Sequence, residues 1–143
     1  MVVTSIEPLL DSEFISLPLL LQPVPAGFPS PADDYLEGSI DFQKHLVKHP
    51  AATFAVRAQG DSMQGAGIFS GDILVVDRAE DPCDGAIVIA VVDGDFTVKR
   101  LRHIKGQVFL CPENSSYQPI PVTNSDDQIW GVVIYSIRKH QPR

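Results

Sequence analysis

The chain is 143 residues long, 44% of them hydrophobic, with a formal net charge of −7 and a pI near 4.8. This length and composition fit one compact domain with a single core. The acidic balance argues against direct nucleic-acid binding, because contact with a phosphate backbone depends on clustered Lys and Arg. The two cysteines and four histidines lack the paired spacing of a zinc site, so we expect no metal and no cofactor, with Cys83 and Cys111 as reduced thiols.

The N-terminal segment is rich in proline. Six prolines within the first 35 residues rule out a regular helix and remove donors from any central strand. Apolar residues among them, such as Phe14 and Phe28, suggest that the segment lies against a surface. We therefore predict an extended arm over residues 1–40, followed by a β domain over residues 41–143.

Part of this arm looks like the end of a secretory signal, with Leu17–Leu21 followed by Val24-Pro25-Ala26. Acidic Glu7, Asp11 and Glu13 precede that run, however, and prolines interrupt it, which a signal peptide does not tolerate. No stretch reaches the roughly 20 apolar residues that a membrane-spanning helix needs. We expect a cytoplasmic protein that makes no membrane contact.

A short helix is predicted between arm and domain. Asp41 is placed to cap it, and the spacing of Phe42, His45 and Leu46 gives it one apolar face that should be buried. Pro50 should end it.

From residue 53 onward the sequence has a β pattern of short apolar runs separated by Gly, Pro and Asp. These runs predict strands over residues 53–57, 73–76, 86–92, 108–110, 120–122 and 129–135. Asp93-Gly94 is a typical type I′ turn and predicts a hairpin. The expected fold class is all-β, a twisted and partly closed β domain.

The hairpin register decides where Lys99 points. A two-residue turn at Asp93-Gly94 pairs Val92 with Asp95 and, four steps on, Val88 with Lys99. Because side chains alternate along a strand, either Lys99 or its neighbour Arg100 must face apolar side chains. The pattern alone leaves open whether Lys99 is buried or reaches water from a sheet edge.

Ser62 follows a predicted strand and precedes a glycine-rich turn, in a loop where the backbone can approach a ligand. Taken alone, such a serine is usually a turn residue. It becomes a useful nucleophile when a base takes its proton, and a lysine kept neutral by burial can do so. Thr97, two residues from Lys99 on the same face, is a candidate orienting residue that could accept a hydrogen bond from the amine.

Four segments resemble the LexA/UmuD family of serine–lysine self-cleaving proteins in order and spacing: Gly60-Asp61-Ser62-Met63, Gly67-Ile68, Gly71-Asp72-Ile73-Leu74-Val75-Val76-Asp77 and Phe96-Thr97-Val98-Lys99. The 37 positions from Ser62 to Lys99 also fit. Residues 26–35 resemble the UmuD branch, and Ala26-Gly27 falls where that family cuts itself. The resemblance extends from residue 26 to the C-terminus, whereas residues 1–25 match poorly.

This resemblance implies a mechanism. Neutral Lys99 would deprotonate Ser62, which would attack the Ala26 carbonyl and leave Gly27 as a new N-terminus. Backbone N–H groups around Ser62, with Asp61 as a candidate, would hold the oxyanion.

The resemblance also implies partners. It predicts a homodimer, cleavage stimulated by a RecA filament on single-stranded DNA, and a cleaved form that serves as accessory subunit of a UmuC-like Y-family polymerase. That polymerase would be an error-prone enzyme copying past DNA damage in the SOS response.

Two other functions compete with this one. A signal-peptidase-like protease also uses a serine and a lysine, but it needs a membrane anchor. A non-catalytic adaptor would use the arm and the β domain to bind a polymerase, with Ser62 and Lys99 as structural residues, and residue chemistry does not exclude it. A LexA-type repressor is not expected, because the 26 residues up to the cleavage site cannot hold a helix-turn-helix domain.

Overall fold

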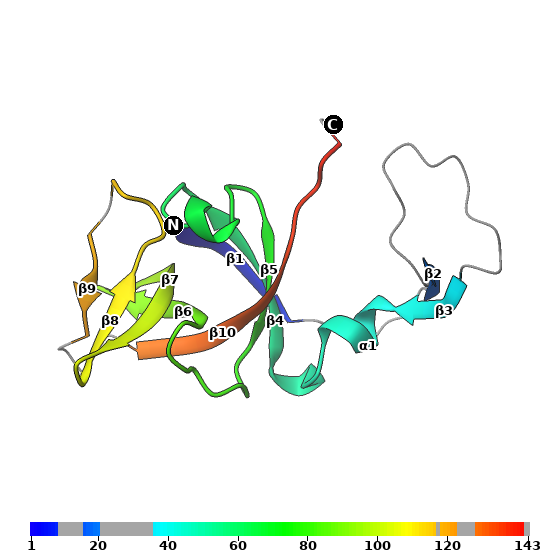
Figure 1. Cartoon of the computed structure of the whole chain (residues 1–143), viewed down its shortest axis with the longest axis horizontal. Helices are drawn as coiled ribbons and strands as arrows, with labels where there is room; N and C mark the ends of the chain where they lie inside the picture. The colour runs from blue at the N-terminus through cyan, green and yellow to red at the C-terminus, as the bar shows by residue number, and fades with distance from the viewer. Residues whose placement is uncertain (9–15, 21–35, 117, 123–127, 142–143) are drawn as a thin grey trace. The chain divides into compact units, whose positions relative to one another are not determined.

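The computed structural model describes residues 1–8, 16–20, 36–116, 118–122 and 128–141 (Figure 1). The chain folds as two compact units. The first joins Met1–Leu10 with His49–Arg143, and the second is Asp11–Lys48.

The first unit is built from antiparallel strands. Its elements are β1 (Val2–Pro8), the 3-10 turn Pro50–Ala52, β4 (Thr53–Gln59), the 3-10 turn Gln64–Ala66, β5 (Ile73–Asp77), β6 (Ile87–Val92), β7 (Asp95–Ile104), β8 (Gln107–Cys111), β9 (Ile120–Pro121) and β10 (Gln128–Ile137). The sheet order is β1-β4-β5-β10-β6-β7-β8-β9, and β1 also pairs with β7. This last pairing closes the sheet into a barrel. The predicted mainly-β, partly closed fold is thereby confirmed.

β1, drawn in blue in Figure 1, lies between two other strands of this barrel. It pairs antiparallel with β4 from Val2↔Gln59 to Pro8↔Phe54, with an irregularity after Val3, and Val2 also pairs with Thr97 of β7. The expectation that the proline-rich segment forms no central strand is wrong here, because Pro8 stands at the very end of β1 and interrupts no pairing before it.

The β6–β7 hairpin has the predicted register. Val92 pairs with Asp95, Ala90 with Thr97, and Val88 with Lys99. Asp93 and Gly94 both have positive φ, 50° and 81°, as a type I′ turn requires.

Two apolar clusters fill this unit. The larger joins Met1, Val56, Ala58, Met63, Ile68, Leu74, Val76, Ile89 and Val98, with Val3 and Ile6 of β1 packed against it. The smaller gathers around Val88, Leu101 and Leu110. Because Met63 is fully buried directly beside Ser62, the serine loop is fixed by core packing on one side.

The second unit contains β2 (Ser16–Leu20), β3 (Leu36–Asp41) and α1 (Phe42–Leu46). β2 and β3 form a two-stranded antiparallel sheet. Asp41 caps α1 as predicted, accepting a hydrogen bond from the Lys44 N–H at 3.3 Å. The expected burial of its apolar face is wrong, since no residue of α1 is buried. A helix of five residues contains barely one i to i+4 step, too little for an apolar stripe.

Within the described residues, no helix is both long and apolar enough to cross a membrane. Cys83 and Cys111 are free thiols, and burial raises the pKa of Cys111 above its ordinary value.

Candidate active site

Ser62 lies in the turn that follows β4, and its side chain is fully buried. Gly60 makes the turn possible, with a φ of 114° that other residues rarely adopt. A Cβ at that position would also stand 3.3 Å from the Met1 Cα. The chain therefore turns sharply after β4, and this turn places Ser62 in the wall of the barrel.

A second loop holds the serine turn by its backbone. The Glu113 N–H donates to the Ser62 carbonyl at 2.7 Å, and the Gly65 N–H donates to the Glu113 carbonyl at 2.7 Å. A Cβ on Gly65 would lie only 2.6 Å from that carbonyl oxygen. Gly65 is thus required by the close approach of two backbones.

Arg138 and Asp72 hold the far side of the same loop. The Arg138 guanidinium donates to both carboxylate oxygens of Asp72, at 3.1 and 3.2 Å, and to the Gly67 carbonyl at 2.8 Å. The same guanidinium stacks 3.8 Å from the centre of the Phe69 ring. Burial would raise the pKa of Asp72, but hydrogen bonds from Arg138 and the Phe69 N–H outweigh it and lower that pKa. The ionised Asp72 carboxylate therefore connects the serine loop to Arg138, which directly follows β10.

Lys99 lies in β7, opposite Val88, and only 7% of it is exposed. The question that the sequence left open is thus settled in favour of burial. Removal of the ammonium from water lowers the pKa of Lys99 below its ordinary 10.5. Its neighbour Arg100 points to the other side of the strand, where it pairs with the Glu113 carboxylate and donates to the Gly85 carbonyl at 2.6 Å.

The Met1 amino group brings Ser62 and Lys99 to one place. It donates to the Ser62 Oγ at 2.5 Å in a buried contact and also interacts with the nearby Lys99 amine. Burial, followed by the positive charge of Lys99, lowers the pKa of this amino group to about 6, and the charge of Asp61 opposes the shift. The predicted serine and lysine therefore surround the same nitrogen atom.

The remaining predicted site residues are placed as follows. Asp61 is exposed, and its carbonyl accepts hydrogen bonds from the Asn114 side chain at 2.9 Å and the Gln64 N–H at 3.3 Å. The Thr97 hydroxyl donates to the Ala90 carbonyl at 3.2 Å, and its predicted role in orienting Lys99 stays a prediction. Ala26 and Gly27 lie outside the described residues.

Sequence reasoning missed two participants. Nothing in the local sequence marks Met1, which reaches the site only because β1 pairs with both β4 and β7. For Glu113 the sequence offers one weak indication of a role, since it is a charged residue directly after Cys111-Pro112, where a predicted strand ends.

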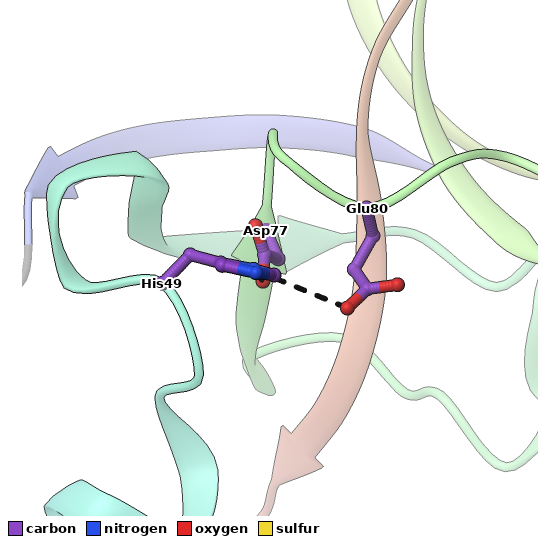
Figure 2. A group of neighbouring side chains, drawn as sticks. All are labelled: His49, Asp77 and Glu80. Carbon is purple, nitrogen blue, oxygen red and sulfur yellow. Dashed lines mark hydrogen bonds and ion pairs between the residues drawn. The ribbon is translucent and has the colours of Figure 1, made fainter.

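One group of side chains has the composition of a metal site (Figure 2). His49, Asp77 and Glu80 each offer a ligand atom, all within 4.8 Å of one another. His49 Nδ1 lies 2.6 Å from Asp77 Oδ2 and 4.0 Å from Glu80 Oε1. The buried Asp77 carboxylate also accepts from the Ala79 N–H at 2.8 Å. These hydrogen bonds satisfy the Asp77 carboxylate. The cluster therefore has a structural role, because it connects the segment before β4 to the end of β5.

Comparison with known proteins gives close relatives. The family described as Peptidase S24-like matches residues 18–134. Protein SamA of Salmonella typhimurium is 50% identical over 123 residues, which are 85% of this chain and 85% of SamA. Protein MucA of Escherichia coli is 40% identical over 127 residues, 87% of this chain and 86% of MucA. The LexA repressor of Aliivibrio salmonicida is 39% identical over 130 residues, 90% of this chain but 62% of the repressor.

Proposed function

Because this chain belongs to the Peptidase S24-like family, and within it to the UmuD branch of the LexA/UmuD proteins, we propose that it cleaves its own Ala26-Gly27 bond. The family predicted from the motifs is confirmed, and with it a place among serine peptidases and in the SOS response to DNA damage. Ser62 is proposed as the nucleophile and Lys99 as the general base.

One observation carries this proposal. Ser62 Oγ accepts a hydrogen bond from the Met1 amino group, and the buried Lys99 amine interacts with the same nitrogen. During cleavage of a peptide bond, the leaving nitrogen must lie beside both the nucleophile and the group that protonates it. An amine nitrogen held beside both groups supports the proposal that Ser62 and Lys99 act together on a peptide bond.

The proposed reaction proceeds in two stages. Neutral Lys99 takes the proton of the Ser62 hydroxyl, whose oxygen bonds to the Ala26 carbonyl carbon, while backbone N–H groups at Asp61 and Ser62 stabilise the oxyanion. Lys99 then returns the proton to the Gly27 nitrogen as the C–N bond breaks. Water, deprotonated by Lys99, finally hydrolyses the Ala26 ester and regenerates Ser62.

The burial of Lys99 allows its amine to act as a base. An exposed lysine is almost fully protonated near neutral pH, whereas the lowered pKa of Lys99 increases its neutral fraction at every pH below 10.5. Because the substrate is part of the same protein, its effective concentration is high and a small cleft suffices.

Further parts of the proposal follow from the UmuD branch. We propose a cytoplasmic homodimer whose cleavage is stimulated by a RecA filament on single-stranded DNA. The cleaved form would serve as accessory subunit of a UmuC-like Y-family, error-prone translesion polymerase.

Mass spectrometry of the purified chain tests the cleavage. After incubation at about pH 10, near the ordinary lysine pKa, wild type should yield fragments that end at Ala26 and begin at Gly27. Ser62→Ala and Lys99→Ala should yield none. Ser136→Ala and Lys139→Ala change the same residue types at exposed positions and should cleave like wild type. Absence of cleavage in wild type, even with activated RecA, would favour the non-catalytic adaptor.

A further inference from the structure

The place that a substrate must occupy is filled by the chain's own first strand. A nucleophilic oxygen attacks a carbonyl carbon from about 3 to 3.5 Å. The Met1 nitrogen lies 2.5 Å from Ser62 Oγ and interacts with the Lys99 amine. The Ala26 carbonyl cannot reach the serine while Met1 remains there.

The backbone beside the site is occupied as well. The Val98 N–H, next to Lys99, donates to the Met1 carbonyl at 3.0 Å. Val2 pairs with Gln59 at the end of β4 and with Thr97 of β7. An extended substrate binding by strand addition would need these same backbone edges.

β1 is held in this position by packing. Met1 is buried in the larger apolar cluster, and Val3 and Ile6 are partly buried against it. Thr4 and Ser5, at the irregularity after Val3, are exposed. The strand is therefore a docked amphipathic element with one apolar face toward the core.

We propose that β1 is a blocking strand, which keeps the intact chain latent by pairing with both β4 and β7 beside Ser62 and Lys99. Self-cleavage then requires β1 to leave this position and free the edges of β4 and β7. This inference rests on the cleavage proposed above and adds its regulation.

A disulfide lock tests it. Ser5 and Arg57 are exposed partners in the β1–β4 register, so Ser5→Cys with Arg57→Cys can be bridged on the surface. The background carries Cys83→Ser and Cys111→Ala to remove the native thiols. The oxidised protein should not cleave at alkaline pH, and reduction should restore cleavage to the rate of the background protein.

A second pair of variants needs no disulfide. Ile6→Asp weakens the docking of β1 and should accelerate unstimulated cleavage about tenfold or more, a tenfold change corresponding to about 1.4 kcal/mol. Ser5→Asp adds the same charge to the exposed side of the strand and should leave the rate unchanged.

The outcomes separate the two proposals. Equal cleavage by oxidised and reduced protein overturns the blocking strand while self-cleavage stands. Failure of the two introduced cysteines to join under oxidation, with no acceleration in Ile6→Asp, also overturns it. If neither wild type nor the reduced lock cleaves at alkaline pH, the proposed self-cleavage itself fails.

Discussion

The two sides of the candidate site are held by different kinds of structure. Ser62 stands in a loop that is held on one side by core packing of Met63 and on the other by single polar contacts with distant residues, chiefly the Glu113 backbone and Arg138. Lys99 stands in the middle of a regular hairpin, where the strand register sets the direction of its side chain. The serine should therefore be sensitive to changes at a few tethers, whereas the lysine should be sensitive to the polarity of its own surroundings.

The largest expected effect comes from the lysine side. Lys99→Met keeps the length of the side chain and removes the base, so cleavage should fall at least about 10²-fold to 10⁴-fold, the usual contribution of a general base. Fragment yield over time at alkaline pH measures it. A variant that still cleaves at the wild-type rate would exclude Lys99 as the base.

Lys99→Met also tests the direction in which the free energy of unfolding changes with pH. The pKa of Lys99 is lower folded than its ordinary 10.5. Between the pKa of Lys99 in the folded protein and its ordinary pKa of 10.5, the unfolded chain binds more protons than the folded protein. The free energy of unfolding of wild type should therefore rise as pH increases toward 10.5. Lys99→Met should lack this rise, as urea unfolding at successive pH values would show.

The next largest effect tests the serine tethers. Gly65→Ala places a Cβ against the Glu113 carbonyl, and Gly131→Ala places one 2.6 Å from a Val76 methyl group in the barrel wall. Both should lower the free energy of unfolding by about 1 to 3 kcal/mol. Only Gly65→Ala should also slow cleavage, by up to about 10²-fold, because it displaces Ser62. Equal rates for the two folded variants would contradict the tether.

A smaller effect is expected where the two sides meet. Arg100, next to Lys99, pairs with the Glu113 side chain, whose backbone holds Ser62. A double-mutant cycle with Arg100→Met and Glu113→Gln should give a coupling of about 0.5 to 2 kcal/mol in stability. Cleavage should change less than in Gly65→Ala, since the backbone bond to Ser62 persists. A coupling near zero would mean that the two sides are independent.

The smallest effect concerns acid stability. The pKa of Asp72 is lowered from 3.8, so its contribution is present above that pH and is lost as pH falls through the lower folded value. Because Arg138 is partly exposed, about 1 kcal/mol or less is expected. Asp72→Asn should flatten the acid limb of the stability curve and should slow cleavage less than Gly65→Ala does. An acid limb identical to that of wild type would contradict the stabilising role of the Asp72–Arg138 pair.

The hairpin was predictable from sequence residue by residue, because a two-residue Asp-Gly turn sets the register and the register sets the pairs. That is why Lys99 could be placed opposite Val88. The burial of Lys99 depended on β1, which comes from a distant part of the chain. Strand alternation carries no information about such partners.

β1 was missed for a related reason. Proline density argued against helix, and the described residues 1–8 and 16–20 contain none. A proline at a strand end costs no pairing, however, and Val3 and Ile6 supply enough apolar contact to dock the strand. The cleavage site Ala26-Gly27 stays a prediction from family resemblance, as it lies outside the described residues.

The closure of the barrel by β1 has a consequence for the order of folding during synthesis. Once made, β1 must wait for β4, which follows it by more than forty residues, and its pairing with Thr97 must wait for β7. Pairing between such distant segments is slow, because the entropy cost of closing a long loop precedes any stabilising contact. On the ribosome, β1 therefore stays unpaired until β4 has emerged, and its pairing with Thr97 forms only after β7.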